Sequence, residues 1–191
     1  MILRVILGIT GASGVVYGVR ILEVLRERDV EVHLVISEMG RRLIELELGR
    51  SYKDMIGLAS SYWENNDLTA PIASGSFRTD GMIIAPCSMK TAASIANGIS
   101  GNLITRAADV TLKERRKLII IPREAPLSDI HLENLLKITR AGGIVIPASP
   151  AFYHLPERIE DLVDFIVGKA LDVLGIEHKL YKEWQGQHHR R

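Results

Sequence analysis

The segment Val5–Gly18, with the sequence VILGITGASGVVYG, constrains the fold of this chain more than any other. Its consecutive apolar and β-branched residues predict a strand over Leu3–Ile9 that is covered on both faces, as in a parallel sheet. The glycine-rich turn Thr10–Gly14 then leads into a helix, and its glycines let a ligand approach the backbone closely. Because the first N–H groups of a helix lack partners within it, the turn predicts an anion-binding site, with Ser13 as a cap or a donor to the ligand.

The glycine spacing separates this turn from two common phosphate loops. Gly8, Gly11 and Gly14 do not match the dinucleotide fingerprint G-x-G-x-x-G, and no Lys follows Gly14 as a P-loop requires. The second expected strand, Val30–Ile36, ends in Ser37 and not in the Asp or Glu that binds a ribose diol. These features disfavour NAD and favour a ligand such as FMN. A turn that serves only to connect the strand to the helix is the alternative interpretation.

Strands and helices are expected to alternate along the rest of the chain. Further strands are predicted at Gly81–Ala85, Lys117–Pro122 and Ile144–Ile146, and residues 51–66 are expected to be irregular or weakly helical. Helices are predicted at Val15–Arg28, Glu38–Leu48, Thr91–Asn97, Asn102–Arg116, Ile130–Arg140 and Arg158–Leu174. This alternation predicts an α/β protein with a three-layer, Rossmann-like or flavodoxin-like fold and a mainly parallel sheet. We expect residues 1–175 to form a single flavin-binding domain and the tail, residues 176–191, to pack on a neighbouring subunit.

Composition excludes several classes of function. The chain has 24 Lys and Arg against 23 Asp and Glu, so its net charge does not indicate nucleic-acid binding. Its single cysteine excludes an internal disulfide framework and CxxC metal sites, and it fits a reducing compartment. The N-terminal residues predict a strand and not a signal peptide, and no apolar run reaches the roughly 20 residues that span a membrane. We therefore expect a cytoplasmic protein that does not enter the membrane.

Polar groups follow two later strands, at the sheet edge where open α/β folds bind ligands. Pro86 ends one strand, and Cys87–Thr91, with the sequence CSMKT, begins a helix of small residues. The strand Lys117–Pro122 runs directly into Arg123 and Glu124, which place a cation and a carboxylate at the end of a buried strand. Cys87 itself is expected to be inert packing, with a nucleophile as the alternative.

Six sequence blocks together resemble the UbiX-type flavin prenyltransferases, and the match covers nearly the whole chain. The blocks are GASG at Gly11–Gly14, CSMKT at Cys87–Thr91, NLITRAADVTLKERR at Asn102–Arg116, PREAP at Pro122–Pro126, IHLEN at Ile130–Asn134 and PAFYH at Pro150–His154. The resemblance implies a dodecamer that joins the dimethylallyl group of dimethylallyl phosphate to reduced FMN, adding a fourth ring. The product, prenylated FMN, is implied to serve a UbiD-type decarboxylase.

The resemblance also implies roles for individual residues. The implied flavin-binding residues are Gly11, Ala12, Ser13, Ser37, Ser88, Met89, Lys90, Thr91 and Arg123. The residues implied to hold the dimethylallyl phosphate group are Lys113, Arg123, Tyr153 and Lys169. Glu47 and Glu124 are the implied acid–base carboxylates, and Ser13 is the third residue implied to be catalytic.

The chain departs from the family pattern at two positions. Leu68 stands where some members have an aromatic residue, which puts any aromatic contribution to the prenyl pocket in question. Lys169 stands where other members use Arg, and both can hold a phosphate, Arg with stricter geometry. The sequence has no aspartate-rich magnesium motif. Because Lys, Arg and Tyr can hold a monophosphate leaving group, we expect that no metal is required.

Two other functions are open from the sequence. One is an FMN-dependent decarboxylase that acts on a peptidyl-cysteine-like or aromatic acid. The other is a non-catalytic flavin-binding protein, in which loss of Lys113 or Tyr153 would change nothing measurable. The choice between monophosphate and diphosphate, and the identity of the pathway served, are also open.

Overall fold

One parallel sheet organises the computed structural model, which describes residues 2–184 and 186. Its strands are β1 (Arg4–Ile9), β2 (Glu31–Ile36), β3 (Ser61–Glu64), β4 (Gly81–Cys87), β5 (Lys117–Pro122) and β6 (Ile144–Val145). They lie in the order β3-β2-β1-β4-β5-β6, and every neighbouring pair is parallel. The strand order reverses between β1 and β4, where doubly wound sheets open a ligand crevice. The predicted α/β fold is confirmed.

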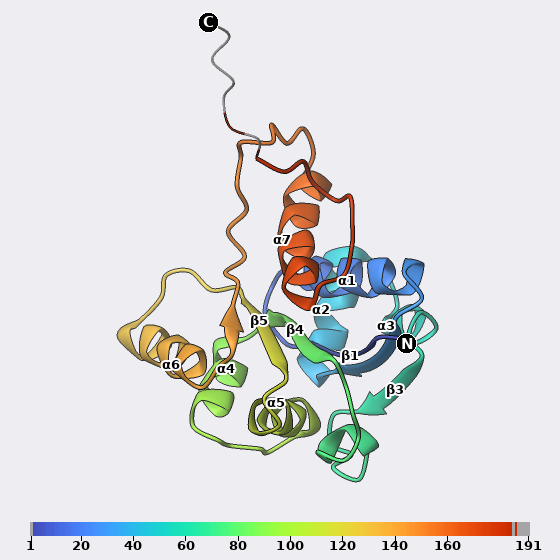
Figure 1. Ribbon diagram of the computed structural model, residues 1–191, viewed down its shortest axis with the longest axis vertical. Coiled ribbons are helices and arrows are strands. Elements are labelled where there is room, and N and C mark those ends of the chain that lie inside the picture. The colour runs from blue at the N-terminus through green and yellow to red at the C-terminus, as the bar shows by residue number, and fades with distance from the viewer. Residues whose placement is uncertain (1, 185, 187–191) are drawn as a thin grey trace, which may run out of the picture.

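Helices cover both faces of the sheet (Figure 1). They are α1 (Val15–Glu27), α2 (Glu38–Leu48), α3 (Tyr52–Ile56), the 3₁₀ helix η1 (Pro71–Ala73), α4 (Met89–Ala96), α5 (Leu103–Lys113), α6 (Asp129–Arg140) and α7 (Ile159–Leu174). The core on one face is closed by α1, α2 and α7, and the core on the other by α4, α5 and α6. The helices among the described residues are all too short or too polar to cross a bilayer.

Strand β1 shows why continuous apolar runs mark this sheet. Val5, Leu7 and Ile9 point into the core under α1 and α7, whereas Ile6 points into the core under α4 and α5. All four are at most 2% exposed. Successive side chains of a strand alternate between faces, so a strand covered on both faces is apolar at every position.

Strand β3 corrects the prediction that residues 51–66 are irregular or weakly helical. The short helix α3 lies in this range, but SYWE at Ser61–Glu64 pairs in parallel with β2, with His33 opposite Ser61. This strand has four residues, lies at the sheet edge and is only partly buried. Its apolar pattern is therefore too short to mark a strand.

The chain after β6 extends away from the sheet before it returns as α7 along α1 (Figure 1). Beyond α7 the tail folds back onto its own helix. A Cβ on Gly168 would lie 2.6 Å from the ring of Tyr181 and 2.7 Å from that of His178, so the absent side chain leaves room for both rings. The first part of the tail thus packs on α7. Its packing on a neighbouring subunit stays a prediction, and residues 185 and 187–191 lie outside the described residues.

Candidate active site

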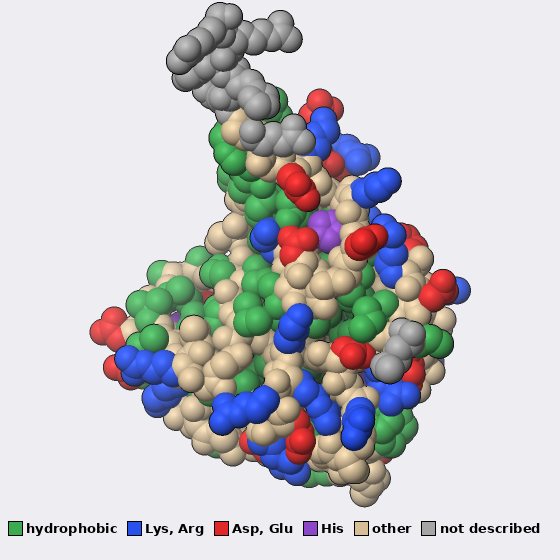
Figure 2. Space-filling model, in the orientation of Figure 1, with side chains coloured by type: hydrophobic (Ala, Val, Ile, Leu, Met, Phe, Trp, Pro, Cys, Tyr) green, Lys and Arg blue, Asp and Glu red, His purple; other side chains and the backbone are tan. Residues whose placement is uncertain are grey.

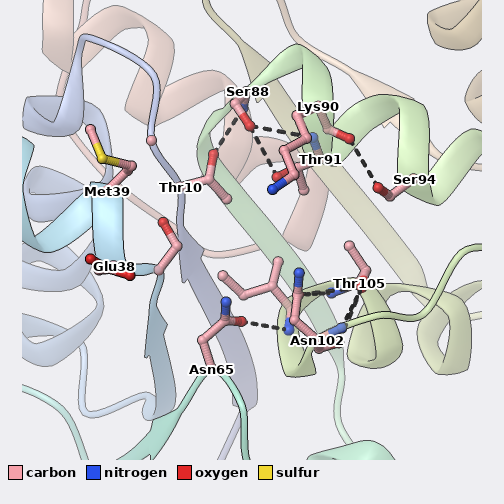
Figure 3. Close-up of a pocket in the computed structure, with 13 residues that line it drawn as sticks. Thr10, Glu38, Met39, Asn65, Ser88, Lys90, Thr91, Ser94, Asn102 and Thr105 are labelled. Atoms are coloured by element: carbon pink, nitrogen blue, oxygen red, sulfur yellow. Dashed lines mark hydrogen bonds between the residues drawn. The ribbon is translucent and has the colours of Figure 1, made fainter.

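A cavity of about 340 Å³ opens at the carboxyl ends of the strands, where the strand order reverses (Figure 3). Its wall includes Gly11 after β1, Ser37 after β2, and Ser88, Lys90 and Thr91 after β4. The structure therefore brings five of the residues predicted to bind flavin around a single cavity.

Three helices begin at this cavity, and their N-cap residues all line it. The Ser37 Oγ accepts a hydrogen bond from Gly40 N at 3.1 Å, at the start of α2. The Ser88 Oγ accepts one from Thr91 N at 3.3 Å at the start of α4. A helix N-terminus carries a partial positive charge and unpaired N–H groups, so three that converge on one cavity favour an anionic ligand.

The third cap, on α5, is Asn102, whose Oδ1 accepts from Thr105 N at 3.0 Å. Its position depends on Asn65 at the end of β3, since Leu103 N donates to Asn65 O and Ile104 N donates to Asn65 Oδ1 at 3.2 Å. Asn65, Asn102 and Thr105 were not among the predicted site residues. Asn102 is recognisable in the sequence as a helix-start residue, but the role of Asn65 follows only from β3.

Thr10 is another residue of this cavity that was not among the predicted site residues. It is 2% exposed, and its Oγ1 donates to Pro86 O at 2.7 Å and accepts from Ser88 N at 2.8 Å. Thr10 therefore joins the end of β1 to the end of β4 and fixes the backbone of Ser88 (Figure 3). Thr10 could have been selected from the sequence, because it directly follows a buried strand.

The glycine turn packs tightly against α2. A Cβ on Gly11 would lie 2.4 Å from Cβ of Met39, so a side chain at this position collides with the first turn of α2. Gly14 has a φ of +100° and is the N-cap of α1, without a side-chain cap. Ser13 is therefore not the cap that the sequence allowed it to be, and its side chain is exposed.

The N–H groups at the start of α1 correct another expectation. Gly14 N and Val15 N donate to Glu47 Oε2, at 2.8 Å and 3.2 Å, so these two groups are occupied by a carboxylate of the same chain. The free N–H groups predicted there are not available at these two residues. The structure nevertheless brings Glu47 to the turn that carries Ser13, although the two are far apart in the sequence.

Arg123 and Glu124 lie on the other side of this turn. Arg123 Nε donates to Ser13 O at 2.9 Å. The exposed Glu124 accepts from Ala125 N at 3.1 Å, and the described residues show no ion pair between it and Arg123. Both residues line a second cavity, of about 260 Å³, formed by the ends of β5 and β6. Three predicted residues, Ser13, Glu47 and Arg123, are thus gathered around the glycine turn, with Glu124 beside them.

The residues predicted to hold the dimethylallyl phosphate group lie in three different places within the chain. Arg123 is at the glycine turn. Lys113 is the last residue of α5 and forms an ion pair with Glu114, next to Gly75. It therefore lies near the amino ends of the strands, opposite to the cavity. Tyr153 and Lys169 belong to the region after β6: the Tyr153 ring is 5.9 Å from that of Phe165 on α7, and Lys169 is itself on α7.

Four further residues that the sequence analysis singled out can also be placed in the structure: Ala12, Leu68, Cys87 and Met89. Ala12 and Met89, both predicted to bind flavin, are buried at 7% and 6% exposed. Leu68 is 50% exposed in the loop after β3. Cys87 is fully buried, and burial raises the pKa of its thiol to about 12, so it stays a neutral thiol at ordinary pH. Within the described residues no group of three or more His, Cys, Asp and Glu side chains is placed to hold a metal ion.

Comparison with known proteins places this geometry in a family. Residues 2–171 match the model of the Flavoprotein family. The chain is 51% identical over 182 residues to the flavin prenyltransferase UbiX of Methanocaldococcus jannaschii, with 95% of this chain and 98% of that protein covered.

Two solved structures are similar over almost the whole chain. AnUbiX (PadA1), crystallised in complex with FMN and dimethylallyl pyrophosphate, has a TM-score of 0.96 at 44% identity, with 98% of this chain and 100% of that one covered. A dodecameric FMN-dependent UbiX-like decarboxylase from Escherichia coli O157:H7 has a TM-score of 0.94 at 50% identity, with 96% and 100% covered.

Proposed function

The chain belongs to the Flavoprotein family and, within it, to the UbiX-type flavin prenyltransferases, and from this membership we propose that it joins a dimethylallyl group to reduced FMN. The C–O bond between the dimethylallyl group and phosphate breaks, and the phosphate leaves with the bonding electrons. The flavin forms two bonds to the dimethylallyl group and gives up two protons as the fourth ring closes. One proton adds to the dimethylallyl double bond that is consumed, and the other ends on the phosphate, with Glu124 as the carrier between flavin and phosphate. The product, prenylated FMN, would serve a UbiD-type decarboxylase in the cytoplasm.

The observation that carries this proposal is the convergence of three helix N-termini on the cavity at the strand-order reversal. Ser37, Ser88 and Thr91 offer hydroxyl groups there, and Lys90 adds a cation. This donor set fits the phosphate of FMN. The missing side chain of Gly11 lets the turn pack against Met39 at the wall of this cavity. Reduced FMN supplies the nucleophilic atoms of the reaction.

Two carboxylates, Glu124 and Glu47, are the residues that we propose for proton transfer. We propose that Glu124 accepts a proton as the fourth ring closes, because it is exposed at the second cavity and bonds only to its neighbour Ala125 among the described residues. Glu47 holds the glycine turn through Oε2, and among the described residues its Oε1 makes no hydrogen bond. Arg123 fixes the backbone of Ser13, the third proposed catalytic residue.

We further propose that the phosphate group of the dimethylallyl substrate is held by residues from more than one subunit. Within one chain, Lys113 lies near the amino ends of the strands and Arg123 follows the carboxyl end of β5, so a single chain does not bring them to one phosphate. A neighbouring subunit would supply the missing group, and the dodecamer described for the E. coli relative is the assembly that we propose.

Exposed apolar surface supports such an assembly. Phe152, Leu155 and Ile159, between β6 and the start of α7, are 66%, 81% and 74% exposed. On α6, Ile130 and Leu132 are 69% and 52% exposed. Figure 2 shows hydrophobic side chains gathered on the projecting part of the molecule and on the lobe at the left. Apolar patches of this kind mark surfaces that other protein chains cover.

A test of the reaction is the release of phosphate from dimethylallyl phosphate by purified protein under anaerobic conditions. We expect release only in the presence of reduced FMN, up to about one phosphate per flavin, because the flavin is the acceptor and is consumed. Release that is independent of flavin would contradict the proposal. So would loss of carbon dioxide from an aromatic or cysteine-type acid, which is the alternative function.

A further inference from the structure

Lys169 is held by two groups of its own chain. Its Nζ donates to Asp172 Oδ2 at 3.0 Å, one helical turn away on α7, and to the Tyr181 hydroxyl in the tail at 3.1 Å. The Tyr181 hydroxyl in turn donates to the same oxygen of Asp172. An ammonium has three N–H groups, so this arrangement fixes two and leaves the third without a partner among the described residues.

His178 fixes the other oxygen of Asp172. Its Nε2 lies 3.0 Å from Asp172 Oδ1, and Leu180 N donates to its Nδ1 at 3.2 Å. Because Nδ1 accepts a hydrogen bond, Nε2 is the ring nitrogen that donates to Asp172. The His178 side chain is only 7% exposed, so water competes little for this bond. Asp172 therefore accepts hydrogen bonds from three side chains, which hold its carboxylate in one position.

The two tail residues are seated against the helix. Gly168 leaves the space that the Tyr181 and His178 rings occupy. The Tyr181 ring also lies 5.0 Å from that of Phe165, which in turn contacts Tyr153. Tyr153 and Lys169, both proposed to hold the phosphate of the dimethylallyl substrate, are thus supported by one continuous set of aromatic contacts along α7.

We infer that Asp172 and Tyr181, supported by His178, are positioning residues that hold the Lys169 ammonium ready for the phosphate of the dimethylallyl substrate. The inference rests on the proposed function, in which Lys169 binds that phosphate. A free lysine side chain samples many rotamers, and a ligand must order it on binding. Ordering it beforehand removes that cost and increases affinity for the substrate without taking part in bond breaking.

The kinetic test uses full-length protein loaded with FMN and compares Tyr181→Phe with the wild type. Loss of this hydroxyl should raise the KM for dimethylallyl phosphate by about 2- to 10-fold, because the Lys169 ammonium is no longer ordered before the substrate binds, with kcat and FMN affinity nearly unchanged. Tyr62→Phe is the matched control, because the Tyr62 hydroxyl also pairs with a basic side chain, Arg41. An unchanged KM in Tyr181→Phe would overturn the inference.

The same substitution in a Lys169→Met background separates positioning from a general structural role. If Tyr181 acts through Lys169, Tyr181→Phe should have no further effect once the ammonium is gone. An equal rise in KM in both backgrounds would show that Tyr181 does not act through Lys169.

A titration of Lys169 tests whether Tyr181 positions the ammonium, and it needs no catalytic turnover. The hydrogen bonds that Lys169 donates to Tyr181 and Asp172 raise the pKa of Lys169 above its ordinary value, in spite of partial burial. With ¹³C-methylated lysines followed by NMR, Tyr181→Phe should lower the pKa of Lys169 towards the ordinary value, and an unmoved pKa would overturn the inference. If wild-type protein released no phosphate, the proposed function would fail, while this titration would still show whether Tyr181 controls the ammonium.

Discussion

At the scale of single residues, Ser88 combines two roles that can be measured separately. It caps α4 and its hydroxyl lines the cavity. We predict that Ser88→Ala weakens FMN binding by about 2- to 10-fold, because one hydrogen bond to the ligand is lost. Fluorescence titration of FMN gives the affinity. Ser51→Ala is the control, since Ser51 caps α3 away from the cavity. Equal FMN affinity in both variants would show that Ser88 only caps the helix.

Glu124 is the residue on which the proposed proton transfer depends. Its side chain bonds only to the adjacent Ala125 among the described residues, so Glu124→Gln should leave the fold and FMN binding intact. Loss of a general base typically slows turnover by about 10²–10⁴, and we predict an effect of this size on the rate of prenyl transfer. Glu133→Gln, on the exposed side of α6, is the control. Turnover at the wild-type rate would remove Glu124 from the mechanism.

At the scale of elements, the glycine turn depends on its close contact with α2. A Cβ at position 11 would overlap Met39, and overpacking of this kind typically costs about 1–3 kcal/mol. We predict that Gly11→Ala lowers the melting temperature by several degrees and weakens FMN binding, because either the turn or α2 must shift. Gly57→Ala is the control, since a Cβ there would be 3.6 Å from the Asp54 carbonyl oxygen and meets no clash. A melting temperature and FMN affinity equal to those of Gly57→Ala would contradict this account of the turn.

Elements with strong local patterns could be predicted from the sequence alone. The buried strands β1, β2, β4 and β5 are apolar runs, and α2 was predicted with its observed bounds and with its cap Ser37. Strand β3 was missed because four partly buried residues at a sheet edge carry little periodicity. The role of Asn65 was missed with it, since Asn65 positions α5 only because it follows β3.

Long-range contacts explain the rest of what sequence reasoning could not reach. No local pattern places Glu47 at the start of α1, and its hydrogen bond to Gly14 N depends on the packing of α2 beside the glycine turn. Only the family resemblance selected Glu47. Thr10 likewise acquires its role from a bond to Pro86 on a neighbouring strand.

At the scale of the whole molecule, the proposed residues for the dimethylallyl phosphate group are divided between separate regions of the chain. We predict that Lys113→Met and Glu124→Gln are each strongly impaired alone but that mixed oligomers regain part of the activity. In such oligomers some sites receive an intact Lys113 from one chain and an intact Glu124 from another. Activity of co-expressed, doubly tagged oligomers is the measurement. No recovery, in oligomers shown to contain both variants, would place the whole site within one chain.

The central claim is that the cavity at the β1–β4 reversal serves covalent prenylation of the flavin. The most direct measurement is the mass of the flavin extracted after anaerobic incubation of the protein with reduced FMN and dimethylallyl phosphate. The account predicts a flavin heavier than FMN by one isoprene unit, formed only when both substrates and the protein are present. Recovery of unaltered FMN from folded, flavin-bound protein would contradict it.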